Sequence, residues 1–178
     1  GTNNVVLGEQ LIHWYAKTLQ GRVSKVIILT GTPGAASSED RIKGINNVLP
    51  QYPNIQVLAS QTGYYDRAKS LPVAENLLQR FPEAEAILCL NDEMAMGALA
   101  AAMSMNRTIK ITGMDANPDA LKAVEEGKLY MTIALPPYEI GRIGVQFAQQ
   151  VLAGQQVQAM KIMEVSFVTK ENVGQFKK

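Results

Sequence analysis

Polar and aromatic residues stand in this sequence just after short apolar runs, and their types could together hold a small polar molecule. A guanidinium and a carboxylate make directional, charge-assisted hydrogen bonds to paired hydroxyl groups. An aromatic ring can cover the apolar C–H face of a sugar ring, mainly by burying apolar area. This combination suits a crevice that binds a sugar. The candidate residues are Arg41, Tyr64 or Tyr65, Asn91, Asp92, Asp115 and Asn117.

Most of these residues also have a purely structural interpretation. Asn91, Asp92 and Asn117 stand where helical patterns begin, and Asn and Asp are typical helix-capping residues. Arg41 could form a salt bridge along a helix face, and either tyrosine could pack in a loop. Asp115 directly follows the buried run Ile-Thr-Gly-Met, and a carboxylate there points into a crevice or accepts hydrogen bonds from backbone amides. From the residues alone these alternatives stay open.

The sequence offers little for catalysis, metal binding or nucleotide binding. Cys89 and His13 are the only residues of their types, which excludes an intrachain disulfide, a cysteine-based metal cage and most histidine-rich metal sites. The Gly31–Gly34 turn lacks the spacing of a phosphate-binding loop, and no nucleophile–base pair stands out. We therefore predict a binding protein rather than an enzyme, with no catalytic residue, no metal site and no cofactor.

The charge balance argues against nucleic acid or a membrane surface as a partner. The chain has 178 residues, of which 17 are basic and 16 acidic, for a formal net charge of +1. Hydrophobic residues make up 47% of it, enough for the full core of a globular domain. No apolar run approaches the ~20 residues that span a bilayer. We expect a small-molecule partner and no nucleic acid.

The elements that would position the candidate residues alternate along the chain. Short apolar runs rich in β-branched residues predict strands at Lys25–Thr30, Ile55–Ser60, Ala86–Leu90, Ile109–Met114 and Tyr130–Leu135. Longer stretches with a helical period predict helices at Val5–Leu19, Ser38–Leu49, Asp66–Arg80, Asp92–Met105, Pro118–Glu126 and Tyr138–Leu152. The alternation predicts an α/β fold, a doubly wound parallel five-stranded sheet with helices on both faces. Ligands bind such a sheet beyond the carboxyl ends of its strands, where the candidate residues lie.

Five long stretches form a specific pattern in combination. In order, they are GTPG with ASSEDRIKGI, VLASQTGYYDRAKSLPVAENLL, AILCLNDEMAMGALAA, ITGMDANPDALKAVEEGKLYMTIA and PPYEIGRIGVQFAQQVLAG. They resemble the ribose-binding branch of the periplasmic sugar-binding proteins, over nearly the whole chain. The resemblance implies that the pocket residues of the family fall on Arg41, Tyr65, Asn91 and Asp115. A fifth pocket position, usually Gln, Asn or Asp in the family, is Leu135 here, which leaves the identity of the sugar open.

The resemblance implies the C-terminal lobe of a two-lobed periplasmic binding protein fold. Residues 1–136 correspond to the sugar-binding lobe. Residues 137–178 contain the last predicted helix and an extended strand within 160–169, and both are expected to pack on an N-terminal lobe that this sequence lacks. We therefore expect the partners of the chain to include that lobe, or a second copy through self-association.

A chain of this family would be the solute-binding component of a bacterial ABC-type sugar uptake or chemotaxis system. It would bind a monosaccharide or a similar small polyol in the cleft between two lobes and pass it to the membrane permease of the transporter. The resemblance also implies a periplasmic location, or an extracytoplasmic one with a lipid anchor in a Gram-positive bacterium.

Two other functions stay open for the same fold class. The effector-binding domain of lactose-repressor-type transcription factors has the same two-lobed fold, although this chain has no helix-turn-helix segment and no basic face. A flavodoxin-like enzyme is the third possibility, because this fold class supports many chemistries. Consumption of a sugar or sugar phosphate by the protein would distinguish an enzyme from a binding protein.

Overall fold

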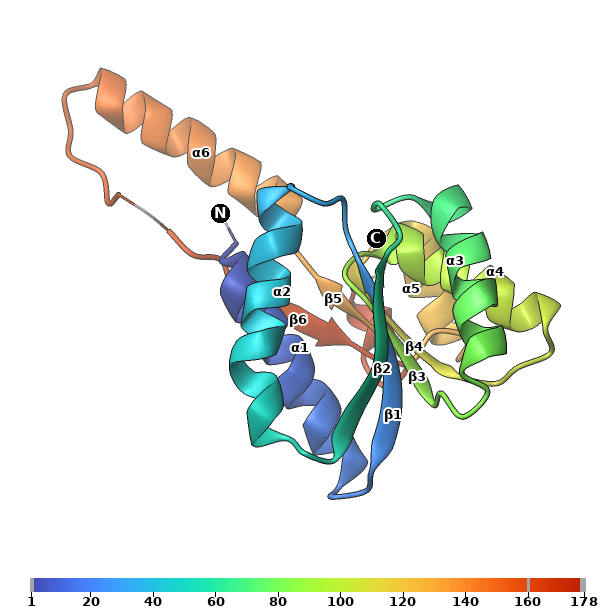
Figure 1. Ribbon diagram of the computed structural model, residues 1–178. Helices are drawn as coiled ribbons and strands as arrows, with labels where there is room; N and C mark the ends of the chain where they lie inside the picture. Colours follow the sequence, from blue (N-terminus) through green and yellow to red (C-terminus); the bar gives the residue numbers. More distant parts are fainter. Residues whose placement is uncertain (1, 160, 177–178) are drawn as a thin grey trace.

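The structure, a computed structural model, describes residues 2–159 and 161–176 and contains one six-stranded sheet (Figure 1). The strands follow the order β2-β1-β3-β4-β5-β6 across the sheet. The first five strands are parallel to one another, and β6 is antiparallel to β5. Their bounds are β1 Ser24–Thr30, β2 Ile55–Thr62, β3 Ala86–Cys89, β4 Lys110–Asp115, β5 Met131–Ala134 and β6 Ser166–Val168. The predicted parallel sheet of five strands is confirmed, and a short antiparallel strand is added at one edge.

Helices cover both faces of the sheet, as predicted. The helices form a layer on each face of the sheet, and the last helix extends away from it (Figure 1). One layer is α1 Asn4–Leu19 and α2 Ala36–Val48, and the opposite layer is α3 Arg67–Arg80, α4 Asp92–Ser104 and α5 Pro118–Glu125. The remaining elements are α6 Pro137–Leu152 and the 3-10 turns η1 Leu49–Gln51 and η2 Val173–Gln175.

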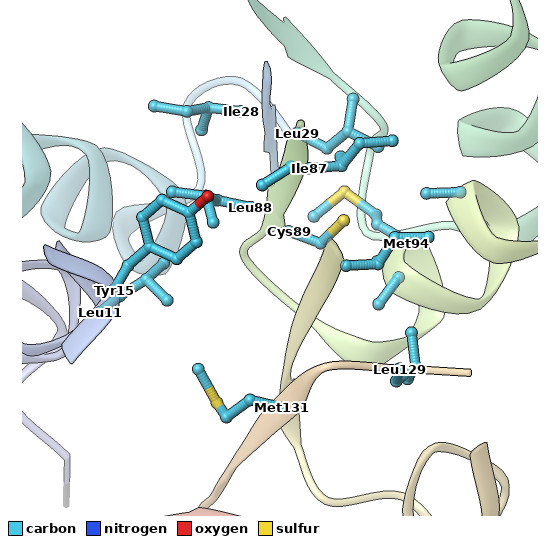
Figure 2. Close-up of a cluster of buried hydrophobic side chains, with 14 of the residues drawn as sticks. Leu11, Tyr15, Ile28, Leu29, Ile87, Leu88, Cys89, Met94, Leu129 and Met131 are labelled. Atoms are coloured by element: carbon cyan, nitrogen blue, oxygen red, sulfur yellow. The ribbon is translucent and has the colours of Figure 1, made fainter. Parts of the chain in front are cut away.

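The core forms on both faces of the central strands, because these contain runs of consecutive apolar residues. All four residues of β3 are buried, and so are five consecutive residues of β1. Figure 2 shows the alternation: Leu88 faces Tyr15 of α1, and the next residue, Cys89, faces Met94 of α4. Strands that are buried on both faces are typical of parallel sheets with helical layers above and below.

Two glycines allow α1 and α2 to cross in close contact. A Cβ atom at Gly8 would lie 2.1 Å from the carbonyl oxygen of Arg41, and one at Gly44 would lie 1.9 Å from that of Val5. Neither position can therefore hold a side chain unless the helices move apart. The crossing fixes how far α2, and with it Arg41, stands from α1.

The C-terminal strand belongs to this sheet, which differs from the prediction that it packs on another lobe. Ser166–Val168 pairs with β5, and the Phe167 ring stacks on that of Trp14 with centroids 5.7 Å apart and planes 3° apart. Residue 160, where the predicted strand was to begin, lies outside the described residues, and among the described residues 161–169 the strand covers Ser166–Val168. The physical reason is that β5 is an edge strand without β6, and its open hydrogen-bonding side accepts the returning chain.

Helix α6 is amphipathic and lies outside the core. None of its residues is buried, and Tyr138 and Val145 are 72% and 61% exposed. Figure 1 shows it extending from the end of β5 beyond the body formed by the sheet and the other helices. Its apolar face is therefore open to solvent in this chain.

Candidate functional site

Arg41 lies on α2 at the carboxyl edge of the sheet and is held there by hydrogen bonds. Arg41 is only 6% exposed, although an arginine is seldom buried unless its guanidinium has hydrogen-bond partners. Nε donates to Asn4 Oδ1 over 3.0 Å, and Nη1 donates to the carbonyl oxygen of Leu90 at the end of β3. These two bonds use Nε and Nη1 of the guanidinium. The guanidinium is thus oriented before any ligand arrives.

Tyr65 provides an aromatic ring that contacts Gly31 and Ser37. Its φ of 57° lies in the left-handed region, which few non-glycine residues adopt. The ring rests on Gly31, where a Cβ atom would lie 2.1 Å from it, and Ser37 Oγ donates to its hydroxyl over 3.3 Å. The Arg41 guanidinium carbon lies 5.9 Å from the ring centroid. The ring and the guanidinium therefore form one surface.

Asn91 is both a helix cap and a neighbour of that surface. Its Oδ1 accepts from the amide of Met94 over 2.9 Å, which caps α4 as the structural interpretation predicted. Its Nδ2 donates to the carbonyl oxygen of Tyr65 over 3.5 Å. Asn91 is buried, so the cap bond fixes the amide beside Tyr65.

Asp115 ends β4 in a strained conformation and lies in the field of Arg41. Its φ is 129° and that of Ala116 is 58°, and such conformations cost about 1–3 kcal/mol each. Partial burial raises the pKa of Asp115, while the positive charge of Arg41 and a hydrogen bond from the amide of Asp92 oppose that rise. The site thus holds a partly desolvated carboxylate and a guanidinium at the same sheet edge.

Leu135 follows β5 at the same edge and is half-buried against the core. The preceding residue, Ala134, is the cross-strand partner of Asp115. The structure therefore places Leu135 next to the strand end that carries Asp115. It brings Arg41, Tyr65, Asn91 and Asp115 together through the contacts above, whereas Leu135 shares only the strand edge with them.

Asp92 differs from its structural interpretation as a helix-capping residue. It does not cap α4, because Asn91 does, and it is completely buried. Its Oδ1 accepts from Thr132 Oγ1 over 2.6 Å, and its Oδ2 accepts from the amide of Asn117 over 2.8 Å. Burial raises the pKa of Asp92 to about 6, against the lowering effect of these two hydrogen bonds. Thr132, a polar residue inside the apolar run MTIA, was the sequence signal for such a partner.

Cys89 and His13 are other side chains in the described residues that could carry chemistry. Within residues 2–159 and 161–176, no cluster of three or more His, Cys, Asp or Glu side chains could hold a metal ion. In the same ranges, no helix is long and apolar enough to cross a membrane. Burial raises the pKa of the Cys89 thiol, and His13 Nδ1 bonds the hydroxyl of Tyr52 over 2.7 Å. Desolvation of Cys89 suppresses the thiolate that a cysteine nucleophile requires.

Comparison with known sequences agrees with the resemblance. The sequence model of the periplasmic binding protein domain matches residues 1–156. The ribose import binding protein of Bacillus subtilis is 40% identical over 157 residues, which cover 88% of this chain and 50% of that protein. The D-allose-binding periplasmic protein of Escherichia coli is 37% identical, with 82% of this chain and 47% of that protein covered. The chain thus spans about half the length of the curated relatives it matches.

Solved structures agree over almost the entire chain. A periplasmic solute-binding protein of Actinobacillus succinogenes with bound D-allose superposes with a TM-score of 0.92 at 27% identity, covering 98% of this chain and 62% of that one. The binding protein of the Shewanella arabinose ABC transporter, bound to L-arabinofuranose, gives 0.89 at 31% identity, covering 98% and 60%. The predicted family is confirmed: the chain belongs to the periplasmic binding proteins and is similar to their ribose-binding type.

Proposed function

We propose that this chain is the sugar-binding lobe of the solute-binding component of an ABC-type sugar uptake system, and that it binds rather than transforms its ligand. The observation that carries the proposal is the convergence of Arg41, Tyr65, Asn91 and Asp115 at one sheet edge. Relatives named for ribose and D-allose support a monosaccharide or a similar small polyol as ligand. The family supports an extracytoplasmic location and a membrane permease as partner.

In this proposal each side chain recognises a different part of the sugar. Arg41 donates to, and Asp115 accepts from, hydroxyl groups, and such bonds are strengthened by the charge. The Tyr65 ring covers an apolar C–H face, and Asn91 adds one amide contact. Leu135 forms an apolar wall, so the sugar edge facing it is deoxygenated or otherwise less polar, or the ligand is smaller than a hexose. A wall of this kind tolerates a missing hydroxyl that a hydrogen-bonding residue would require.

A second lobe, or a second copy of the chain, would cover the other face of the sugar. The matched part of this chain spans about half the length of these relatives, which supports a second lobe in the functional protein. Helix α6 offers it an open apolar face. One side of that helix carries a shallow hollow of about 500 Å³ lined by Pro137, Tyr138, Gly141, Arg142, Val145 and Gln146. Closure of two lobes would remove water from the ligand, and hydrogen bonds left facing water contribute little net.

A titration of the ¹⁵N-labelled chain with D-ribose, D-allose, L-arabinose and myo-inositol tests the proposal. We expect the amide resonances of residues 31–41, 63–66, 91–92 and 115–117 to shift with at least one of them. Affinity should be no tighter than about millimolar, because one lobe provides part of the contacts and association costs several kcal/mol of lost freedom. Absence of any shift at saturating sugar, or consumption of the sugar, would refute the proposal. Micromolar affinity of a monomer would instead show that one lobe suffices.

A further inference from the structure

The buried carboxylate of Asp92 connects three elements at the carboxyl edge of the sheet. The residue begins α4, yet both of its oxygens bind groups from later in the chain. Oδ1 accepts from the hydroxyl of Thr132 on β5, and Oδ2 accepts from the amide of Asn117 at the start of α5. The sequence separations of these two bonds are 40 and 25 residues. Burying a carboxylate costs free energy. Beginning a helix does not require a fully buried carboxylate whose partners are all distant in the sequence.

These bonds lie around the strained turn that contains Asp115. Asp115 and Ala116 both have positive φ, and neither is glycine. Asn117 follows them directly, and the amide of Ala116 donates to Thr132 Oγ1 over 3.3 Å. Asp92 therefore binds one end of the turn directly and its middle through Thr132. Strained backbone of this kind persists only where its surroundings enforce it.

The same residue also ties the turn to the rest of the site. Its own backbone amide donates to the carboxylate of Asp115, and its neighbour along the chain is Asn91. Gly113 leaves room for this arrangement, because a Cβ atom there would lie 2.1 Å from Asp92 Oδ1. Asp92 thus contacts Asp115 through its main chain and fixes the turn that contains Asp115. It is also the direct neighbour of Asn91 along the chain.

We propose that Asp92 is a positioning residue of the sugar site, which holds Asp115 in its binding orientation through Thr132 and Asn117 without touching the sugar. The inference rests on the proposed function, because it assigns Asp92 a task in that same site. It predicts that loss of the Asp92–Thr132 bond lowers affinity in molecules that are still fully folded. A purely structural role would lower only the stability.

Buried threonines on neighbouring strands provide a matched test. Thr132→Val removes the hydroxyl with almost no change in shape, while Thr132→Ser keeps it. Thr112→Val is the control, because Thr112 is equally buried and its hydroxyl has no hydrogen-bond partner among the described residues. We expect Thr132→Val to weaken D-ribose binding about tenfold, since it leaves Asp92 Oδ1 and the amide of Ala116 unsatisfied. Thr132→Ser and Thr112→Val should bind within about twofold of the parent chain.

Asp92 itself gives the second measurement. Asp92→Asn keeps an acceptor for the Asn117 amide and can donate to Thr132, so it should bind within about threefold of the parent, whereas Asp92→Ala should lose at least about tenfold. Each Kd comes from the NMR titration, at a temperature where thermal unfolding shows the variant to be folded. The amide shifts of Ala116 and Asn117 in the free protein report whether the turn has moved.

The outcomes separate this inference from the proposed function. If the parent chain binds no sugar, the proposed function fails. If the parent binds and Asp115→Ala does not, but Thr132→Val binds as the parent does, the positioning role of Asp92 is wrong and the sugar site stands. Weaker binding by Thr132→Val, with rescue by Thr132→Ser, supports the role even if Asp92→Ala does not fold.

Discussion

At the scale of single residues, the electrostatics of the site depend on one pair of opposite charges. Burial raises the pKa of Asp115, and the positive charge of Arg41 opposes that rise. Arg41 is itself held by hydrogen bonds to Asn4 and to the end of β3, which order its guanidinium without a ligand. Because these side chains are already ordered, ordering them on ligand binding costs little free energy.

Asp115→Ala should therefore weaken sugar binding strongly when a second lobe encloses the ligand. Removing one charged partner of buried hydroxyl groups costs about 2–5 kcal/mol, which corresponds to a Kd at least about 30-fold higher. Calorimetry or NMR titration measures the change. Asp115→Asn is the matched control: it keeps the shape and one acceptor oxygen, so its loss should be smaller. Unchanged affinity in Asp115→Ala would remove this carboxylate from the site.

Leu135 should determine which sugar is preferred. Leu135→Gln restores a hydrogen-bonding side chain and should raise affinity for sugars with a hydroxyl at that edge relative to their deoxy analogues. Leu135→Met, which stays apolar, should leave the ranking as in the parent. Competition among ribose, its deoxy analogues and hexoses measures the ranking. An identical ranking in all three proteins would show that Leu135 does not line the site.

Asp92 should make the stability of the protein fall as pH rises. The pKa of Asp92 is about 6 in the folded chain, compared with an ordinary value of 3.8 that applies to the unfolded chain. The folded chain therefore holds the proton more tightly. Such a group stabilises the fold less as pH rises from about 4 to 6, by about 3 kcal/mol in total. Asp92→Asn lacks this dependence, so its stability relative to the parent should increase over that window. Denaturant unfolding at a series of pH values tests this, and a constant difference would contradict it.

The sequence allowed part of the arrangement of the candidate site to be predicted, for a physical reason. The meeting of Arg41, Tyr65, Asn91 and Asp115 at one sheet edge was predictable, because strand ends in a parallel sheet converge there. The true partners of Asp92 depend on how α4, the β4–α5 turn and β5 meet in space, and no local pattern encodes that.

At the scale of elements, predicted and observed bounds agree to within about two residues, as the length and period of the apolar runs allow. The exception is β6. Only its last residue, Val168, is buried, and a strand of three residues has too little alternation to reveal its pairing partner. Its place in the sheet is set by the open edge of β5, which is a tertiary property.

The crossing of α1 and α2 should be the most sensitive helix contact. Gly44→Ala would press a methyl group into the backbone of α1 at Val5, and overpacking of this kind costs about 1–3 kcal/mol. It should also displace Arg41 and so weaken sugar binding. Gly144→Ala in α6 is the control, because nothing lies within 4 Å of a Cβ atom there. Chemical denaturation compares the two, and equal stability would show that the helices can separate without cost.

At the scale of the whole molecule, the open face of α6 should cause self-association. Large exposed apolar patches are typical of interaction sites in soluble proteins. We expect sedimentation velocity to show concentration-dependent association of the chain, and Val145→Asp to reduce it. Val23→Asp is the control, because Val23 is 55% exposed, close to the 61% of Val145, but lies just before β1. A parent chain that stays monomeric at every concentration would contradict this.

The stacking of Trp14 on Phe167 gives the protein an optical label for its last strand. Trp14 is the only tryptophan in the sequence, so the intrinsic indole emission of the chain comes from that one ring. The ring lies on α1 and touches β6, which joins the sheet only through three residue pairs with β5. Short edge segments open more easily than a core does. A red shift of the emission that precedes the loss of helical circular dichroism would therefore record β6 leaving the sheet while the rest of the fold is intact.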